Sequence, residues 1–587
     1  MVEVPSAEEG AAHSFAPPPP PLVHAPTAAT FRLRAHYLVA FSVTSVLSSQ
    51  HFFPWHIDVG TANYVIAFVF TIAASLSTHI CSNAVLRVIP FSGGAFGLAR
   101  VSLGFYVGFL VASAECLGYI FNSAQAALAF GDILAPLLLP SSSFSSAILH
   151  PLLTLLVHAL ALWIHLGMHV RVWWRCCSVL AALVVASLLL VFLAAAIGTG
   201  PPSSSSSSPP PPPSAYTAWL VLPHFGRCFL GPDCLHLCCD DVHQPHITMT
   251  RVKSIAFAAT TLFAIALLTV LVHLAPPAPT DAAPSLAPLY QRLSPHQSFP
   301  SALVSIPATL ALVFSWTYSA AAVLRAMAAS RLVSRHLRRR QLALARDGIA
   351  PVAAAALSTI VCLVAHVVPS LSPIAVSLLC ACVTHAAQCA GFLYLRRAFK
   401  RLDVHLQSRL NLVHAVFAMV VWFLAALSLL VLQPQSPTTA ATAAGLVVAG
   451  SGYYYGHARG AQKFSHSERQ CLLFAHVILF NKNKSKQNTK RTRRESMSIR
   501  NGSLNNVRRK SIATTPPTSS THSTETESTE MPRRMSRSRR SSAALATNFI
   551  VRDGKIIPIA MLPPPAGPSL GGRRRSSSKS IELATLE

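Results

Sequence analysis

Three ionisable side chains stand inside long apolar stretches of this chain, where a charge needs a specific partner. They are Glu115, Arg227 and Asp233. A charged side chain at the centre of a membrane costs roughly 2.5–3.5 kcal/mol on insertion scales, so it is expected to face a cavity or a counter-charge. Glu115 is therefore a candidate for proton coupling or for an internal ion pair, and Asp233 belongs to the same group.

A second group of chemistry-bearing residues crowds into one short segment and offers several types of zinc ligand. Adjacent cysteines cannot easily bind one ion together, and no second cysteine pair with two-residue spacing completes a site. We therefore assign no metal and no cofactor. The residues concerned are Cys234, His236, Cys238, Cys239, Asp240, Asp241, His243 and His246.

A run of polar side chains, 48–51, interrupts the first apolar stretch and is followed by Pro54 and Trp55. Such a cluster favours a break in a membrane helix, where unwound backbone offers N–H and C=O groups to a ligand. The alternative is that the cluster forms the polar mouth of a span. The candidate binding residues here are Ser49, Gln50, His51 and Trp55.

The composition places these residues in a polytopic membrane protein. Of the 587 residues, 52% are hydrophobic and 11% are charged, whereas soluble proteins carry about 25% charged residues. The net charge is +27, but much of it lies after about residue 458. A basic tail on an apolar body indicates a membrane surface or a regulatory tail rather than nucleic acid. The 13 cysteines are scattered, many within apolar runs, as is typical of free buried thiols.

About twelve apolar runs have the length of a membrane-spanning helix. We therefore expect an all-α membrane protein with a disordered leader (1–30), a transmembrane domain (31–460) and a basic, Ser/Arg-rich disordered tail (461–587). The runs lie near residues 36–55, 62–89, 105–139, 149–169, 176–199, 216–238, 254–275, 301–328, 351–369, 372–395, 410–432 and 439–457.

Basic residues alternate between the loops that join these runs. If the N-terminus lies in the cytoplasm, the cytoplasmic loops are basic and include Arg251 and Lys253, whereas the opposite loops are rich in Ser and Pro. This alternation fits the positive-inside rule. It predicts a multi-pass protein with both termini in the cytoplasm, in the plasma membrane or an internal membrane.

The tail repeats a pattern in which a serine closely follows paired arginines, which suits kinases that favour basic sites. Phosphorylation there would weaken attraction to an anionic membrane face. The alternative is an unmodified basic tail that binds the membrane or retains topology. The candidate sites are Ser496, Ser511, Ser536, Ser541 and Ser576.

Several blocks, in order along the chain, resemble the amino acid–polyamine–organocation (APC) superfamily of permeases. The glycine-rich stretch Pro90–Gly104 is similar to the family's loop after the second helix. The stretch Ala114–Ile120 is similar to the third helix of its ethanolamine-permease-like branch. The likeness covers roughly 35–470, and its further blocks are Leu222–Asp233, Cys238–Pro245, Ser301–Arg335 and Leu393–Arg401.

This resemblance implies a five-plus-five inverted-repeat transporter fold with two extra C-terminal helices. In that fold the substrate lies near the midplane, between broken first and sixth helices. Phe225 and Phe229 would line or gate the site, although at helical spacing they could as easily pack the core. The resemblance adds Gly226, Arg227 and Gly231 to the substrate-binding candidates, and Asp240 and Asp241 to Glu115 and Asp233 as gating or coupling candidates.

The chain departs from the family pattern at both expected breaks. Gln50 stands at a family glycine, His51 at an acidic residue and Pro54 at a second glycine, so a natural partner for an ammonium group is missing. Arg227 stands where the family usually has an aromatic residue. Its guanidinium could hold a substrate carboxylate, pair with Asp233 or Glu115, or mark a site that no longer transports.

These observations predict a secondary transporter of amino acids or related small amines that works by alternating access; they do not determine its direction or its coupling ion, for which protons are the candidate. The alternative is a non-transporting permease-like sensor or scaffold, regulated through its phosphorylatable basic tail. The tail's expected partners are anionic lipid and kinases, and we expect no nucleic-acid partner. Because the chain offers no nucleophile–base pair and no convincing metal set, it is not expected to be an enzyme.

Overall fold

The computed structural model divides the chain into two compact units, Met1–Glu495 and Ser496–Glu587. In the second unit, the described elements are the antiparallel strands β1 (Phe549–Arg552) and β2 (Lys555–Pro558). The predicted leader and all five phosphorylation candidates lie outside the described residues. Those residues are 33–54, 61–88, 93–138, 143–197, 215–242, 244–274, 301–334, 349–398, 408–465, 468–469, 549–552 and 555–558.

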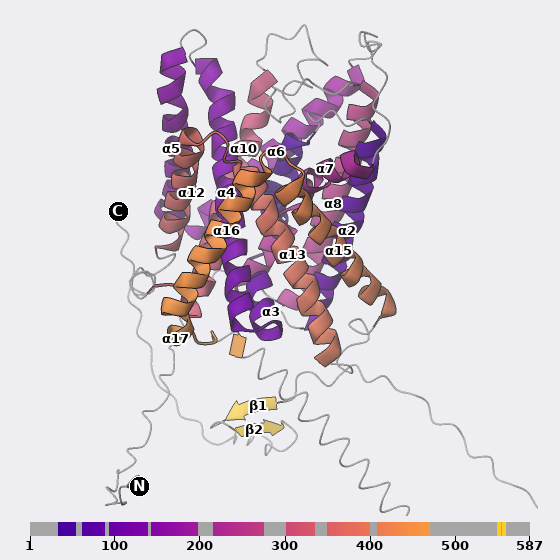
Figure 1. Ribbon diagram of the computed structural model, residues 1–587, viewed down its shortest axis with the longest axis vertical. Helices are drawn as coiled ribbons and strands as arrows, with labels where there is room; N and C mark the ends of the chain where they lie inside the picture. Colours follow the sequence, from indigo (N-terminus) through magenta and orange to yellow (C-terminus); the bar gives the residue numbers. More distant parts are fainter. Residues whose placement is uncertain are drawn as a thin grey trace, which may run out of the picture. The chain divides into compact units, whose positions relative to one another are not determined.

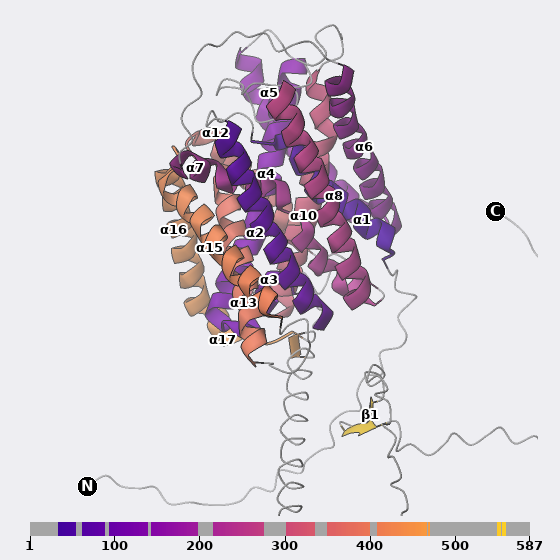
Figure 2. The same cartoon turned by 90° about the vertical axis from the view of Figure 1, so that its right-hand side faces the viewer.

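Long helices that run side by side form the first unit (Figure 1; Figure 2). Within the described residues, nine helices are long and apolar enough to cross a membrane, so this is a multi-pass membrane protein. They are α2 (Thr61–Val88), α4 (Phe105–Leu138), α5 (Ser143–Gly167), α6 (Val170–Ile197), α8 (Pro245–Leu274), α10 (Ile306–Ala329, preceded by the 3-10 turn η4, Ser301–Ser305), α12 (Ala350–Val367), α13 (Pro373–Ala398) and α15 (Arg409–Val431).

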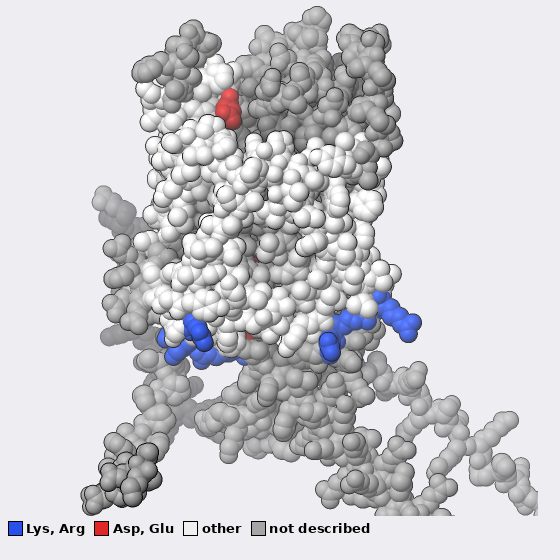
Figure 3. Space-filling view, viewed as in Figure 1, with Lys and Arg blue, Asp and Glu red and all other residues white. Residues whose placement is uncertain are grey.

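The outer surface of this bundle is apolar, as expected for helices that face lipid. Large side chains such as Trp163 and Leu262 are 60% and 68% exposed, which a soluble protein would avoid over so wide an area. Lysine and arginine gather at one end (Figure 3). We call it the basic end; from the direction of the helices, it contains Arg87, Arg171, Arg251, Arg331, Arg396, Arg409 and Arg459.

The first and sixth predicted runs are not continuous helices. The first consists of α1 (Ala35–Val46) and the 3-10 helix η1 (Leu47–Phe52). The sixth consists of α7 (Ala215–Gly226) and the 3-10 helices η2 (Arg227–Phe229) and η3 (Pro232–Asp241). Each run therefore begins with 12 α-helical residues and then tightens.

Serine and threonine hydroxyls accompany the break in the first run. Ser42 donates to the carbonyl of Leu38 (2.8 Å), Ser45 to that of Phe41 (2.9 Å), and Ser49 to that of Val46 (2.5 Å). Side-chain bonds of this kind compete with the helix ladder and often bend a helix. The predicted break in the first helix is confirmed, and it begins at Leu47.

The twelfth predicted run forms α16 (Ser436–Tyr453), which falls outside the nine long apolar helices. It continues through a single π-helical turn, η5 (Tyr454–Ala458), into the short helix α17 (Arg459–Ala461). Beyond α17 the described chain returns to the bundle, where Glu468 is buried.

The glycine-rich stretch 90–104 contains a short helix, α3 (Gly94–Ser102), at the basic end (Figure 1). Gly108 at the start of α4 lets the two helices approach closely. A Cβ built on Gly108 would lie 2.7 Å from the Cα of Arg100 and 2.8 Å from its backbone nitrogen. The close packing of α3 against α4 therefore requires a small residue at position 108.

Gly108→Ala is expected to destabilise the protein by about 1–3 kcal/mol, because the added methyl group meets backbone that cannot rotate away. Thermal unfolding of the purified chain in detergent would show a lower midpoint. Gly445→Ala in α16 is the matched control, since nothing lies within 4 Å of the added Cβ. Equal midpoints for the two variants would contradict close packing of α3 against α4.

Candidate functional site

The two broken segments contact each other. The Nε2 atom of Gln50 in η1 donates a hydrogen bond to the carbonyl of Cys228 in η2 (2.8 Å). The guanidinium of Arg227 lies over the ring of Phe52, 4.6 Å from its centroid. Residues that the sequence places in two distant runs are therefore neighbours.

Two prolines explain why carbonyls in the sixth run need partners from other helices. Pro223 lies inside α7 and Pro232 begins η3, and proline has no N–H to offer the carbonyl four residues earlier. The carbonyl of Trp219, four residues before Pro223, accepts a hydrogen bond from Ser428 Oγ (2.8 Å). The carbonyl of Cys228, four residues before Pro232, accepts one from the Gln50 amide.

Gly231 completes the break between η2 and η3. Its φ of +123° is open to glycine and strained for other residues. A Cβ there would also lie 2.6 Å from Val46 Cγ2 and 3.1 Å from the carbonyl carbon of Ser45. The sixth run therefore turns directly against the end of α1.

The polar residues predicted in the first run are all buried. Ser49, Gln50 and His51 are 2% exposed or less. His51 Nε2 lies 3.0 Å from the hydroxyl of Ser187 on α6. Gln50 and His51 therefore tie η1 to η2 and α6, while Trp55 lies outside the described residues.

Phe225 and Phe229 belong to an aromatic cluster in the core. The ring centroid of Phe225 lies 5.3 Å from those of Phe53 and Phe68, and Phe229 lies 6.3 Å from Phe68. These edge-on and tilted contacts are typical of core packing. Gly226 lies beside Trp422, whose ring would be 3.3 Å from an added Cβ.

Arg227 does not pair with Asp233 or Glu115, so this one of the three alternatives for Arg227 is wrong. Asp233 pairs with other side chains, and Glu115 accepts from Phe96 and Tyr119. Arg227 is 5% exposed. Among the described residues no carboxylate lies within ion-pair distance of it. It is a buried cation whose described contact is an aromatic ring, and not a counter-ion.

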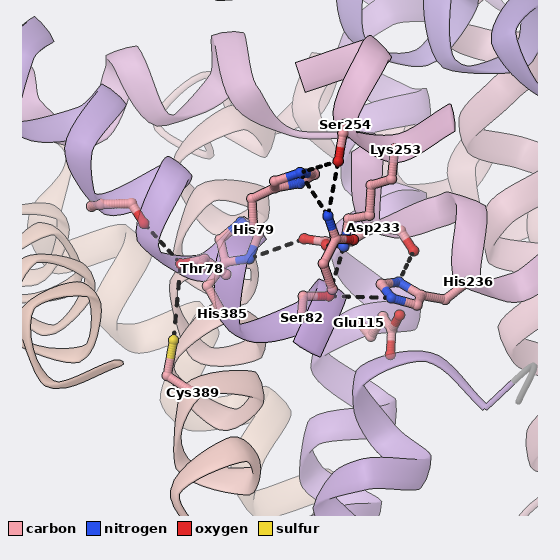
Figure 4. A network of polar contacts seen from close by, with 12 residues as sticks. Thr78, His79, Ser82, Glu115, Asp233, His236, Lys253, Ser254, His385 and Cys389 are labelled. Atoms are coloured by element: carbon pink, nitrogen blue, oxygen red, sulfur yellow. Dashed lines mark hydrogen bonds and ion pairs between the residues drawn. The ribbon is translucent and has the colours of Figure 1, made fainter. Parts of the chain in front are cut away.

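Asp233 is the centre of a polar network between four helices (Figure 4). Its Oδ1 lies 2.8 Å from Lys253 Nζ on α8, and its Oδ2 lies 3.1 Å from His385 Nδ1 on α13. The Lys253 ammonium also donates to Ser82 Oγ on α2 (2.6 Å). An ion pair with further hydrogen bonds is what a buried lysine requires.

The position of Lys253 corrects the sequence analysis, which placed Arg251 and Lys253 in a loop. α8 begins at Pro245, so both lie inside this helix, and Lys253 is 1% exposed. The sequence signal that could have indicated its burial is the helical spacing: Met249 and Phe257, four residues on either side of Lys253, are buried as well. Lys253 is the main site residue that sequence reasoning missed.

Further hydrogen bonds extend the network along α2. His236 of η3 lies 3.2 Å from Ser82 Oγ. The Asn83 amide donates to Ser254 Oγ (3.1 Å) and lies 2.9 Å from His79 Nε2. α2, α8 and η3 are therefore joined by polar contacts in the interior of the bundle (Figure 4).

Glu115 is 4% exposed and joins α4 to the start of α3. Its Oε2 accepts the backbone N–H of Phe96 (3.2 Å), and its Oε1 accepts the hydroxyl of Tyr119 (3.3 Å). Gly94 makes this approach possible: its φ is +56°, and an added Cβ would lie 2.8 Å from Glu115 Oε1.

A small central pocket of about 30 Å³ separates these two carboxylates. Such a volume suits one water-sized group. Its wall is rich in hydrogen-bond acceptors, including the side-chain oxygen of Gln388, which has no partner among the described residues. The polar lining residues are Glu115, Asn122, Asp233, Thr384, His385 and Gln388.

A larger cavity of about 470 Å³ lies among η3, α3, the C-terminal part of α10 and the loop between α5 and α6. Aromatic side chains form much of its wall, and Trp173 stacks on Tyr318 with centroids 4.6 Å apart. Charged groups line it as well. Its principal lining residues are Phe96, Trp173, Asp241, Tyr318, Arg325 and Glu468.

The remaining predicted residues fall at the end of η3. Asp240 and Asp241 are its last two residues, and the Asp241 carbonyl accepts the N–H of Leu33 (2.9 Å). Cys234 and Cys238 are buried. Within the part of the chain that the structure describes, no three His, Cys, Asp or Glu side chains are grouped as metal ligands would be.

No protein-family model matches the chain, and no curated protein matches it. Any assignment of function therefore rests on the broken helices, the polar network and the two cavities.

Proposed function

We propose that this protein is a secondary transporter that carries amino acids or related small amines by alternating access. The observation that carries the proposal is the contact between two broken helices inside a bundle of membrane-spanning length. The interior of a continuous helix satisfies its own backbone groups, whereas the Cys228 carbonyl of η2 accepts from Gln50 and the Trp219 carbonyl of α7 accepts from Ser428. Breaks of this kind are where transporters bind polar solutes within a membrane.

The buried charges support a zwitterionic or amine substrate. Arg227 offers five N–H donors beside η1 and suits a carboxylate. The central pocket offers the acceptors of Glu115, Asp233 and Gln388, which suit an ammonium group. The large cavity is lined by Phe96, whose N–H bonds Glu115 of the central pocket, so we infer that it provides the route from the basic end, which we assign to the cytoplasm.

A direct test uses the full-length chain purified into liposomes. Uptake of a panel of radiolabelled amino acids and ethanolamine is measured with and without an imposed pH gradient. We expect saturable uptake of at least one compound. Empty liposomes provide the background, and uptake at background for every compound would refute the transport proposal.

A second candidate is a permease-like sensor that binds a ligand without transporting it. The small volume of the central pocket, about 30 Å³, and the Gln50 side chain that fills the break in place of a ligand favour it. Thermal stabilisation of the chain by a compound that is never taken up would support this candidate over the transporter.

Glu115→Gln is expected to abolish the response of uptake to a proton gradient. The glutamine side chain still accepts a hydrogen bond from the Phe96 N–H, but its amide cannot bind and release a proton as a carboxylate does. The ratio of uptake with a gradient to uptake without it should fall to about 1. Asp132→Asn, which changes an exposed carboxylate near the far end of α4, is the control and should keep the wild-type ratio. A wild-type ratio in Glu115→Gln would exclude Glu115 as the coupling group.

A further inference from the structure

A short segment after α17 packs back onto the basic end of the bundle. We call it the latch; it comprises Gln462–Ser465 with Glu468 and Arg469. The Glu468 carboxylate accepts two hydrogen bonds from Arg100 Nη1, at 2.7 and 3.0 Å. Both side chains are 1% exposed or less. Burial lowers the pKa of the Arg100 guanidinium, and the Glu468 carboxylate opposes this shift.

Every other contact of Glu468 also holds the latch in place. Its Oε2 accepts the N–H of Ser465 (2.6 Å) and the hydroxyl of Ser330 at the end of α10 (3.0 Å). The N–H of Glu468 in turn donates to Ser465 Oγ (3.2 Å). This reciprocal pair is a capping box, so one carboxylate orders the latch and binds it to α3 and α10.

Aromatic contacts add to the ion pair. The ring centroids of Phe464 and Phe105 lie 4.9 Å apart, and the Arg100 guanidinium lies 5.2 and 5.3 Å from them. The N–H of Lys463 donates to the carbonyl of Ser330 (3.1 Å). The latch is therefore specifically docked.

The helix that the latch holds also binds a residue that lines the central pocket. α3 has nine residues. Near its first turn Phe96 donates its N–H to Glu115, which lines the central pocket, and near its end Arg100 binds Glu468. One rigid helix thus connects a carboxylate of the latch with a carboxylate of the pocket.

The latch also borders the large cavity. Ser465 and Glu468 line this cavity together with Gly93 and Phe96 from the start of α3. Removal of the latch would take away part of the wall. It would also remove the counter-ion of Arg100 and the Phe464 ring beside its guanidinium, and with them the contacts that hold the end of α3 in place.

We propose that the latch is an autoinhibitory element that restricts the large cavity and, through α3, sets the position of Glu115. This inference deepens the transport function proposed above by adding its regulation, and its physiological meaning rests on that function. Its release opens the cavity at the basic end and frees α3.

The test measures access to the cavity without requiring transport. Ala326 lines the cavity, so Ala326→Cys in the full-length chain reports access through its rate of reaction with a charged thiol reagent. The chain without this substitution gives the background from native thiols. Glu468→Gln should accelerate labelling about fivefold or more, the usual lower range of coupling between sites. Lys463→Gln, which changes an exposed side chain of the latch, should leave the rate unchanged.

Phe464→Ala is a second latch variant, used in case Glu468→Gln does not fold. It weakens the latch without leaving a charge unpaired. Faster labelling in both variants supports the latch, even if no compound is transported. Unchanged labelling in both folded variants overturns the latch, whatever the uptake measurements show. The labelling experiment can therefore refute the latch without refuting transport, and the uptake experiment can refute transport without refuting the latch.

Discussion

Lys253→Met is expected to destabilise the protein by about 3–5 kcal/mol, the usual loss when one partner of a buried ion pair is removed. Methionine keeps most of the side-chain volume, so the loss reports the charge and not a cavity. Asp233 would remain in the interior with His385 alone, and Ser82 would lose its donor. Thermal unfolding in detergent should show a much lower midpoint.

The matched control removes both charges together. Lys253→Met combined with Asp233→Asn should be more stable than Lys253→Met alone, because no uncompensated charge remains. If the double variant is no more stable than the single one, the ion pair does not account for the loss. In that case the loss comes from the hydrogen bond that Lys253 donates to Ser82 on α2.

Arg227→Met is expected to reduce uptake at least about 30-fold, while the unfolding midpoint changes little. A buried interaction between a charged pair is commonly worth 2–5 kcal/mol, and 1.4 kcal/mol is tenfold in binding. Arg227 has no carboxylate partner among the described residues, so its removal leaves no such partner unpaired. Uptake in liposomes and thermal unfolding measure the two effects separately.

Arg251→Met is the control for Arg227→Met. Arg251 is exposed on α8, so its loss should change neither uptake nor stability. A large loss of stability in Arg227→Met would indicate that the guanidinium supports the fold through Phe52. Full uptake with full stability would exclude Arg227 from the site.

The breaks in the first and sixth helices were predictable because their causes are local. Pro223, Pro232 and Gly231 act on the backbone of their own segment, and the polar run 48–51 is visible in one window. Membrane-spanning length is also local, since a continuous apolar run is enough to indicate it. For these features the sequence is a sufficient guide.

The partners of the buried charges were not predictable in the same way. Asp233 is bound by α8 and α13, and the choice of Lys253 over Arg227 depends on which faces of three helices meet. Lys253 was assigned to a loop because α8 begins at Pro245, before the apolar run 254–275 from which the helix was predicted. The contact of Glu468 with Arg100 joins residues 368 positions apart, and no local pattern indicates it.

The ion pair between Asp233 and Lys253 also bears on how the chain is made. A lone lysine in a membrane helix costs roughly 2.5–3.5 kcal/mol at insertion, so α8 alone enters a bilayer at a disadvantage. Its counter-ion lies only 20 residues earlier, and the ribosome has therefore already produced it when α8 emerges. We expect η3 and α8 to enter the membrane as a neutralised pair, which places the formation of the central network early in biogenesis.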